Sequence, residues 1–472
     1  MTAEDCATDI LVIGGGMAGL SAAVAAVQTG VRVTVVEKSA QLGGSARLSA
    51  GMFWAPKDIS IARKTIPDAD PVLQAKYLSE YLAAVQWMRD QGIHVDEQFN
   101  GIMTIGIGFP VNMPQWLTAC EKLLAGGPVP ATVLLNTSSV KLLMSNTFGV
   151  SGAVLTTKAG ECFTVKAAAT IIATGGFQGC PELVSKHLGP GCDSIFVRSN
   201  PYSTGDGYKL IKQAGAGFSS GLSTFYGHLL PSPLARRDVD PTQFIHLAQF
   251  QSGWAVLVNE HGKRFCDETF GDEVNNQHLA RQPNRRGYMI LNEATRVRYA
   301  LSEVFPNAGK VDRLQMAKSV GGSVMTAETY AELVDKMASE WGLPKSQLTK
   351  TLDDFNVASS RAPGHEAILL DAPVGLNHAP HASLASAGPL WALAVQPSIT
   401  FTYGGAKIDT SARVLTQDGV PVQGLYAAGM DAGGFSNYRY GGGLSLAFVT
   451  GRWAAHGAVG DVLAERTAKS RI

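Results

Sequence analysis

The first forty residues contain the feature that most limits the fold of this chain. Residues 9–13 (DILVI) form a short apolar run rich in β-branched residues, which predicts a buried parallel strand. The run leads directly into GGGMAG at residues 14–19 and then into an Ala-rich stretch that favours a helix. A second strand-like run, residues 31–36, ends at Glu37. This order predicts a βαβ unit that binds a dinucleotide.

The glycines and the carboxylate of this unit each have a separate task in binding such a cofactor. Gly14 allows the tight turn after the strand, Gly16 lets the backbone approach the pyrophosphate, and Gly19 lets the helix pack closely on the strand. The N–H groups at the start of the helix, together with the positive end of its dipole, attract the phosphates. Glu37 can accept hydrogen bonds from both ribose hydroxyls, which disfavours a 2′-phosphate. The unit by itself fits either NAD or FAD.

Length and charge limit what else the chain can do. Its 472 residues exceed what one hydrophobic core supports, so we expect two lobes. The 39 basic and 39 acidic residues balance, which argues against nucleic acid or anionic membrane as partners and favours small molecules. Six cysteines without a CxxC pair, a start unlike a signal peptide and the lack of a long apolar run predict a soluble cytoplasmic protein without a membrane span. A homo-oligomer is compatible with the sequence.

Further glycine-rich segments follow the βαβ unit in order. They are residues 43–51 (GGSARLSAG), 173–177 (ATGGF), 204–207 (TGDG), 403–405 (YGG), 424–429 (GLYAAG) and 442–446 (GGLSL). With these segments the chain resembles, over nearly its whole length, the flavoprotein family that contains soluble fumarate reductases, succinate dehydrogenase flavoprotein subunits and 3-ketosteroid dehydrogenases. The resemblance implies FAD rather than NAD. We expect non-covalent binding, because the first histidine of the chain is His94, far from the segment where some relatives attach the flavin.

The resemblance also implies the fold class. We expect an α/β protein with a discontinuous Rossmann-like FAD-binding domain and an inserted α+β capping domain that contacts the substrate. The FAD-binding domain is expected at residues 1–220 and 365–472, and the capping domain at residues 221–364. Clustered aromatic residues and histidines in residues 221–290 and a helical apolar spacing in residues 327–355 support the division.

The βαβ unit and the resemblance together assign a set of residues to the cofactor. The last helix is expected to direct its N-terminus at flavin N1 and O2, where the reduced flavin carries negative charge. The cofactor-binding residues predicted in this way are Gly14, Gly16, Met17, Ala18, Gly19, Glu37, Lys38, Gly43, Gly44, Ser45, Ser49, Gly51, Val140, Ala173, Thr174, Gly175, Gly176, Asp206, Tyr403, Gly404, Gly429, Ser445 and Leu446.

The fumarate-reducing members of the family hold two carboxylates with arginines and histidines, and this pattern is incomplete here. Residues 259–268 resemble the NxxGxRFxxE segment, but the proton-donating arginine that follows it aligns with Gly271. The histidine before the YGG segment aligns with Phe401, whereas His228 and Arg439 match the other two positions. Because the missing arginine is the acid of that mechanism, reduction of fumarate is disfavoured.

The ketone-desaturating branch matches the last glycine segment better. Residues 440–446 (YGGGLSL) resemble the YxSGxSLG pattern of Δ4-(5α)-ketosteroid dehydrogenases, with Gly442 in place of Ser. In that branch a tyrosine hydroxyl and a backbone N–H hold the substrate carbonyl, and the resemblance assigns these groups to Tyr440 and Gly442. A phenol beside a backbone N–H suits a ketone, because this neutral oxyanion hole strengthens as an enolate forms. Tyr438 adds a second phenol.

The base of such a reaction would be a tyrosine whose pKa is lowered by cations or by a relay. Tyr299 resembles the cap tyrosine of the desaturases and has two arginines nearby in sequence, although a plain surface tyrosine is an equal alternative. Tyr226 or His228 could supply the relay that the missing serine does not. Arg439 either points away as a surface charge or binds a substrate carboxylate, and the second case would favour a keto acid.

The sequence therefore predicts FAD-dependent α,β-dehydrogenation of a cyclic ketone, such as a 3-ketosteroid or an oxocyclohexanecarboxylate. Hydride would pass to flavin N5 and the electrons to an external acceptor or O2. The alternatives are a fumarate-reductase-like reduction of an activated alkene and a non-catalytic flavin-binding protein. Arg264 and Glu268 are expected to form an ion pair between cap and core rather than a proton relay. His378 and His381 have the spacing of a metal pair, but a proline lies between them and no third ligand is close, so no metal site is expected.

Overall fold

The chain forms two compact units in the computed structural model, which describes residues 6–102, 105–145, 148–235, 239–303, 309–361, 384 and 388–469. Unit 1 comprises Met1–His187, Ser199–Phe225 and Phe401–Ile472, and unit 2 comprises Leu188–Arg198 and Tyr226–Thr400. The expected boundary at 364/365 lies outside the described residues. Strand β18 (Leu390–Gln396) pairs inside the sheet of unit 2, so the residues just before Phe401 belong with unit 2 and not, as expected, with the FAD-binding domain.

Unit 1 is built on a mostly parallel sheet with the strand order β21-β22-β9-β1-β2-β6. The parallel strands are β1 (Cys6–Ile13), β2 (Val33–Val36), β6 (Thr132–Leu134), β9 (Cys162–Ile172) and β22 (Pro421–Ala427). Strand β21 (Arg413–Leu415) is antiparallel at one edge, and β7 (Thr137–Met144) and β8 (Val150–Thr157) form an antiparallel extension from the start of β9. This arrangement confirms the predicted α/β class.

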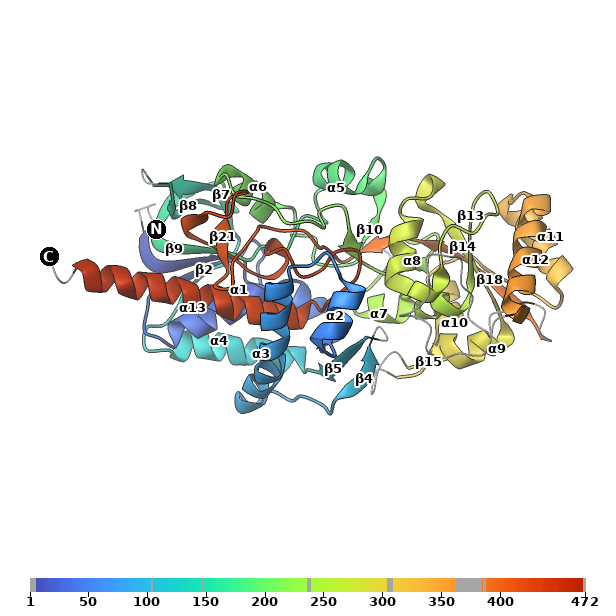
Figure 1. The fold of residues 1–472 in the computed structure, drawn as a ribbon, viewed down its shortest axis with the longest axis horizontal. Coiled ribbons are helices and arrows are strands. Elements are labelled where there is room, and N and C mark those ends of the chain that lie inside the picture. Colours follow the sequence, from blue (N-terminus) through green and yellow to red (C-terminus); the bar gives the residue numbers. More distant parts are fainter. Residues whose placement is uncertain are drawn as a thin grey trace. The chain divides into compact units, whose positions relative to one another are not determined.

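The central strands of this sheet are apolar throughout because helices cover them. Residues Ile10, Leu11 and Val12 of β1 are fully buried, as expected for a strand that is buried on both faces. Helix α1 (Met17–Val27) packs along α13 (Leu444–Lys469), and α13 also contacts α3 (Pro71–Asp90), as Figure 1 shows. A Cβ at Gly451 of α13 would lie 2.3 Å from the carbonyl oxygen of Ala18, so this glycine permits the close approach of α13 to α1.

The remaining elements of unit 1 surround this core. A small antiparallel sheet has the order β3-β5-β4 and is formed by β3 (Met52–Pro56), β4 (Phe99–Ile102) and β5 (Gly106–Pro110). The other helices are α2 (Ile59–Thr65), α4 (Met113–Gly126) and α6 (Asp206–Gln213), and β20 (Phe401–Thr402) begins the last segment. Helix α5 (Pro181–Leu188) and strand β11 (Phe225–Tyr226) span unit boundaries.

Unit 2 is an α+β unit with one antiparallel sheet of order β12-β18-β14-β13, in which β17 pairs with β18. Its strands are β12 (Leu230–Pro231), β13 (Val256–Asn259), β14 (Gly287–Asn292), β17 (Val324–Ala327) and β18. Shorter pairs are β10 (Phe196–Val197) with β19 (Ser398–Ile399) and β15 (Leu301–Ser302) with β16 (Val311–Asp312). Its helices are α7 (Phe244–Leu247), α8 (Asp272–Leu279), α9 (Glu293–Thr295), α10 (Arg313–Ser319), α11 (Tyr330–Trp341) and α12 (Lys345–Arg361).

Helices cover both faces of this second sheet. Alternate residues of β14 enter two different cores, as the two-residue period of a strand requires. Tyr288 and Ile290 join a cluster with residues of α11 and α12, whereas Met289 and Leu291 join a cluster with residues of α8 and α10. Helix α8 is therefore held rigidly against the sheet. Among the described residues, no helix combines the length and the apolar character needed to cross a membrane.

Candidate functional site

The glycine turn after β1 has the shape that the βαβ unit predicts. Gly14 has a φ of +112°, and a Cβ there would lie 2.2 Å from the carbonyl oxygen of Ala173. A Cβ at Gly19 would lie 1.8 Å from the carbonyl oxygen of Gly14. Beside Gly16, by contrast, the nearest atom to a Cβ is the Cα of Gly44 at 4.0 Å. The turn therefore needs glycine for its own geometry at two positions and leaves an open backbone surface at the third.

The N-terminus of α1 differs from those of α3 and α4 in having no side-chain cap. Asp70 and Asn112 accept backbone N–H bonds at the starts of α3 and α4. The N-cap of α1 is Gly16, which has no capping side chain, and the first turn contains no acidic residue. Helix N–H groups need an acceptor, and the positive end of the dipole favours an anion. This end of α1, which includes Met17 and Ala18, thus fits a pyrophosphate.

Glu37 ends β2 with its carboxylate held by backbone donors. Its Oε2 accepts from the N–H of Gly15 at 2.8 Å, and its Oε1 accepts from the N–H of Ser39 at 2.7 Å. The residue is 6% exposed. Since each carboxylate oxygen has a second acceptor position, the group can still receive hydroxyl donors such as those of a ribose.

The segment from Gly43 to Gly51 lies against the glycine turn. The N–H of Gly43 donates to the carbonyl of Gly15 at 2.8 Å, and a Cβ at Gly44 would lie 3.1 Å from the Cα of Gly16. Ser45 Oγ accepts from the N–H of Asn200 at 3.4 Å, and Ser49 Oγ accepts from the N–H of Gly51 at 3.0 Å. The structure thus brings this segment to the turn, as a shared cofactor site requires.

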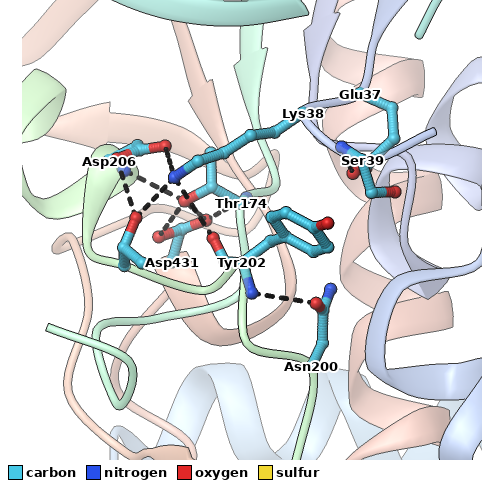
Figure 2. Close-up of polar contacts among 10 residues, drawn as sticks. Glu37, Lys38, Ser39, Thr174, Asn200, Tyr202, Asp206 and Asp431 are labelled. Atoms are coloured by element: carbon cyan, nitrogen blue, oxygen red, sulfur yellow. Dashed lines mark hydrogen bonds and ion pairs between the residues drawn. The ribbon is translucent and has the colours of Figure 1, made fainter. Parts of the chain in front are cut away.

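The loop from Ala173 to Gly176 is fixed by Asp431, a residue that the sequence analysis missed. The Asp431 carboxylate accepts from the N–H of Gly175 at 3.0 Å, from the Thr174 hydroxyl at 3.0 Å and from the Thr174 N–H (Figure 2). Burial raises the pKa of Asp431, although these donors oppose the shift. Asp431 stands two residues after Gly429, but nothing in the sequence indicates that this position lies opposite the loop.

Lys38 and Asp206 pair with each other. Lys38 Nζ lies 2.9 Å from Asp206 Oδ2 and 2.5 Å from Thr204 Oγ1, next to the carbonyl of Tyr202 (Figure 2). The two side chains of the ion pair are 31% and 23% exposed. The assignment of both residues to the cofactor stays a prediction, as does that of Val140, whose side chain on β7 is 54% exposed.

The start of α13 is anchored by a buried hydroxyl pair. Ser445 Oγ lies 2.6 Å from the Tyr77 hydroxyl and donates to the carbonyl of Trp54. Burial raises the pKa of Tyr77 well above its ordinary value. Gly442 has a φ of +107°, and a Cβ there would lie 2.5 Å from the Tyr77 hydroxyl and 2.6 Å from the carbonyl oxygen of Trp54. Position 442 therefore has no room for the serine of the desaturase pattern. Nothing in the sequence had indicated a role for Tyr77 at this site.

Around these residues the other predicted positions of unit 1 are mostly buried. Tyr403 is 3% exposed and Leu446 is 3% exposed. A Cβ at Gly404 would lie 2.5 Å from the backbone nitrogen of Leu222, and Gly429 donates its N–H to Thr450 Oγ1 at 2.9 Å. Glycine at these two positions allows neighbouring segments of unit 1 to pack closely.

Tyr440 lies in a cluster of aromatic rings beside the first turn of α13. Its ring packs edge-on against Trp54, with centroids 4.9 Å apart, and against Phe401 at 5.6 Å. A Cβ at Gly443 would lie 2.7 Å from the Tyr440 hydroxyl oxygen, so the phenol reaches the last glycine segment. Tyr440 is 7% exposed. The structure thus joins Tyr440 and the segment that contains Gly442.

The two residues before Tyr440 differ in exposure. Tyr438 is 37% exposed and has a φ of +67°, a strained value for a residue with a side chain. Its N–H donates to Thr224 Oγ1 at 3.3 Å. Arg439 is only 6% exposed, so the interpretation of Arg439 as a surface charge is wrong. A buried arginine needs compensating contacts, since burial of an unpaired charge is costly.

Tyr299 and His228 lie in unit 2. The Tyr299 ring stacks on Trp254 with centroids 4.1 Å apart, within a π-helical turn at Arg296–Ala300, and Arg298 lies 5.2 Å from the ring. His228 Nε2 lies 2.7 Å from the Tyr226 hydroxyl, and its Nδ1 contacts Asp272. The structure thus joins Tyr226 and His228, which the sequence analysis had treated as alternatives. It also adds Asp272, which no sequence signal had indicated.

The remaining charged candidates also lie within unit 2. Arg264 Nε lies 3.0 Å from Glu268 Oε1, and that oxygen also accepts from the N–H of Leu257 at 2.9 Å. All three residues belong to unit 2, so this ion pair lies within that unit and supports β13, and its expected role as an anchor between cap and core stays a prediction. His378 and His381 lie outside the described residues. Within the described ranges, no group of metal-ligating side chains gathers.

Comparison with known proteins identifies the cofactor that this fold binds. Residues 117–446 match the family model described as "FAD binding domain", and residues 9–175 match the model described as "FAD dependent oxidoreductase". Both matches include parts of the sheet and loops of unit 1 described above.

Among similar sequences, a vinyl phenol reductase from Lactiplantibacillus plantarum is 25% identical over 94% of each chain. An NADH:fumarate oxidoreductase from Klebsiella pneumoniae is 28% identical over 95% of this chain, which spans only 47% of that protein. Among solved structures, a 3-ketosteroid Δ4-(5α)-dehydrogenase from Rhodococcus jostii has a TM-score of 0.70 at 19% identity and matches 97% of this chain and 98% of its own. The structural likeness extends to the fold alone.

Proposed function

Because this chain belongs to the FAD-binding flavoprotein family of the fumarate reductases and succinate dehydrogenases, we propose that it dehydrogenates a cyclic ketone to the α,β-unsaturated ketone. The coarser activity, an FAD-dependent oxidoreduction of carbon–carbon bonds, follows from the family. Bound FAD supplies a hydride acceptor at its N5. The ketone, the direction of the reaction and the residues that assist it are the subject of the proposal.

The position of Tyr440 is the observation that carries this proposal. Its hydroxyl lies at the last glycine segment, where the chain can offer a phenol and a backbone N–H to one substrate oxygen. The rings of Trp54 and Phe401 pack against it and exclude water on that side. A hydrogen bond in such surroundings is stronger than in water. Tyr440 and the N–H of Gly442 would thus bind the carbonyl oxygen and stabilise the negative charge that develops as the α C–H bond breaks.

The side chains predicted to surround the substrate favour a neutral oxygen over a carboxylate next to the Tyr440 hydroxyl. The positions that align with the fumarate-binding histidine and the proton-donating arginine are Phe401 and Gly271, neither of which can hold an anion. Arg439 remains the candidate for a carboxylate elsewhere on the substrate, because it is buried and not a surface charge. A 3-ketosteroid or an oxocyclohexanecarboxylate fits these conditions, with an external acceptor or O2 receiving the electrons.

A second candidate is the reverse reaction, reduction of an alkene conjugated to a neutral oxygen. The vinyl phenol reductase that is similar over 94% of both chains favours it, since that name describes reduction of a C=C bond next to a phenol. Tyr440 would serve this reaction equally well, as a donor to the carbonyl or phenol oxygen. The direction then depends on which partner, donor or acceptor, exchanges electrons with the flavin.

Anaerobic stopped-flow spectroscopy of the flavin band distinguishes these functions. Bleaching of the oxidised band by a cyclic ketone, and not by succinate, supports dehydrogenation. Bleaching only by dithionite, followed by reoxidation with a conjugated enone or vinyl phenol, supports the second candidate and contradicts the first. A flavin that responds to none of these compounds indicates a binding protein without turnover.

The substitution Tyr440→Phe tests whether the Tyr440 hydroxyl holds the substrate oxygen. It should leave the FAD content unchanged and slow flavin reduction by about a hundredfold, the usual effect of losing one oxyanion donor. Tyr81→Phe is the matched control, because Tyr81 is also buried in unit 1 but donates its hydroxyl to the carbonyl of Phe53 at 2.8 Å. The control should reduce its flavin at the wild-type rate. Equal rates for Tyr440→Phe and the control would remove Tyr440 from the mechanism.

A further inference from the structure

Unit 2 contains a chain of three titratable side chains, which we call the Tyr-His-Asp chain: Tyr226, His228 and Asp272. The Tyr226 hydroxyl lies 2.7 Å from His228 Nε2, and His228 Nδ1 contacts Asp272 Oδ2. His228 is 1% exposed and Asp272 is 4% exposed. The ring of His228 also packs edge-on against Phe250, with centroids 4.8 Å apart. These contacts leave the imidazole one orientation.

Asp272 is placed by the start of α8. It is the first residue of that helix, whose positive dipole end stabilises a carboxylate. Its Oδ1 accepts from the N–H of Leu229 at 3.0 Å, and its Oδ2 faces the imidazole. A carboxylate at Nδ1 holds the proton on that nitrogen, so that Nε2 is an acceptor for the Tyr226 hydroxyl. The geometry therefore defines the direction of the chain: phenol O–H to Nε2, and Nδ1–H to carboxylate.

Burial, assisted by Arg198, favours the neutral imidazole of His228 at rest. Burial lowers the pKa of His228, and Arg198 lowers it further, while Asp272 opposes both. Arg313, which is 1% exposed, also interacts electrostatically with Asp272, and burial lowers its own pKa to about 10. A neutral imidazole can accept a proton, and the adjacent carboxylate stabilises the imidazolium that results.

The Tyr-His-Asp chain is accessible at one end. His228 and Asp272 are buried, whereas Tyr226 is partly exposed. Tyr226 is also the residue at which the polypeptide re-enters unit 2, and its carbonyl accepts from the N–H of Thr400, the last residue of that unit. A proton that enters or leaves this buried chain therefore passes through the phenol.

A second tyrosine–histidine pair shows what is special about the first. Tyr208 lies 3.1 Å from His187 Nε2 in unit 1. Within the described residues no carboxylate approaches that imidazole, and its pKa is lowered by burial and by Lys186 alone. This pair has the phenol and the imidazole but not the carboxylate that sets the tautomer and stabilises the imidazolium.

We propose that Tyr226, His228 and Asp272 form the proton relay of the C–C oxidoreduction, with the Tyr226 oxygen as the atom that exchanges the proton with the substrate. In dehydrogenation the α-hydrogen moves as a proton to the Tyr226 oxygen while the original phenol proton moves to His228 Nε2. The electron pair of the α C–H bond forms the C=C bond, and the β-hydrogen leaves with its electron pair to the bound FAD. Once the product has left, the Tyr226 phenol releases a proton to solvent and His228 returns its extra proton to the Tyr226 oxygen. The reverse sequence delivers a proton to the α-carbon of an alkene.

The direction in which the relay moves the proton rests on the proposed function, but the experiment that tests the relay does not. Exchange of the ketone α-hydrogens with D2O, followed by NMR, measures proton transfer without flavin turnover. Tyr226→Phe should retain FAD and lose this exchange by a hundredfold or more, the range that a positioned acid–base group supplies. Tyr208→Phe is the matched control and should exchange at the wild-type rate. Exchange that survives in Tyr226→Phe but is lost in Tyr299→Phe would overturn the proposal.

If the wild-type holoenzyme reduces a conjugated alkene and does not react with a ketone, the proposed dehydrogenation fails while the relay is still tested. In that case Tyr226→Phe should lose deuterium delivery from D2O to the α-carbon, again by a hundredfold or more. Undiminished delivery in that variant would overturn the relay.

The tautomer of His228 gives a readout that needs no substrate. In ¹⁵N NMR of the holoenzyme, wild-type His228 should be a neutral imidazole with its proton on Nδ1. Asp272→Asn should shift the proton toward Nε2, because an amide no longer requires a donor there. A wild-type spectrum with the proton on Nε2 would contradict the relay whatever the activity of the enzyme.

Discussion

The glycine turn of unit 1 and the Tyr-His-Asp chain of unit 2 represent opposite ways of building a functional region. The turn works because side chains are absent: a Cβ at Gly14 or Gly19 would overlap backbone atoms, and Gly16 leaves its surface open. The Tyr-His-Asp chain works because side chains are present, two of them buried, and because the hydrogen bonds that link them join groups that titrate. The first region is therefore sensitive to steric change and the second to protonation.

The largest effect expected from this comparison is steric. Gly19→Ala places a Cβ 1.8 Å from the carbonyl oxygen of Gly14, so the turn must shift. Overpacking of this kind costs about 1–3 kcal/mol or more, and the purified protein should lose most of its bound FAD. Flavin absorbance per protein and urea denaturation measure the two effects.

Gly460→Ala in α13 is the matched control for that substitution. Gly460 is also in a helix, but it is exposed and a Cβ there meets no atom within 4 Å. Alanine should therefore raise the free energy of unfolding by about 0.5–1 kcal/mol through its higher helix propensity. A Gly19→Ala protein that retains its full FAD content would contradict the steric sensitivity of the glycine turn.

A smaller effect, and one that depends on pH, is expected at His228. Its pKa is lowered in the folded state, so between the folded value and about 6.5 the unfolded chain binds more protons than the folded chain. The free energy of unfolding should therefore fall as the pH decreases below about 6.5. In His228→Gln this contribution is absent, and the loss between pH 6.5 and 5.5 should be smaller, by no more than about 1.4 kcal/mol, the limit for one proton over one pH unit.

Urea denaturation at a series of pH values measures this difference. The buried neighbours Asp272, Arg198 and Arg313 are present in both proteins, so the comparison isolates the imidazole. Parallel pH profiles for the wild type and His228→Gln would show that His228 does not respond to burial in the way described.

The smallest effect is expected at Lys38, next to the glycine turn. Its ion pair with Asp206 is partly exposed to solvent, and such pairs contribute about 0–1 kcal/mol. Lys38→Met should change the FAD dissociation constant by less than about fivefold, measured by flavin fluorescence. Glu37→Gln, one residue away, should weaken FAD binding by about tenfold, because its amide would direct a donor at the N–H of Gly15 or Ser39. A larger loss in Lys38→Met than in Glu37→Gln would assign the cofactor contact to the lysine.

Much of unit 1 could be predicted because its signals are local. The turn at residues 14–19, the carboxylate at Glu37 and the segment at Gly43–Ser45 lie in one short stretch of the chain, where the residue types and their order, including the required absence of side chains, indicate a βαβ unit. The residues that the sequence did not disclose are Asp431, Tyr77 and Asp272. Each acts on a partner far away in the chain: Asp431 on Thr174, Tyr77 on Ser445, and Asp272 on His228. No periodicity or spacing indicates such pairs.

The boundary between the two units also could not be predicted from local sequence signals. The helical spacing of residues 327–355 predicted the helices α11 and α12 of unit 2, but the end of that unit depends on β18, which pairs with β14 from about a hundred residues away. Arg439 is a similar case, since arginine is usually a surface residue and only its packing showed that it is buried.

By itself, the sequence determined that this chain binds a dinucleotide and which glycines form the turn, because backbone conformation and steric exclusion depend on residue type alone. Only the tertiary structure decided that position 442 has no room for a serine, that Tyr440 packs against Trp54 and Phe401, and that a tyrosine, a histidine and an aspartate form one hydrogen-bonded chain. The physical reason is that a hydrogen bond between side chains depends on distances of about 3 Å, and these are set by the packing of elements far apart in the sequence.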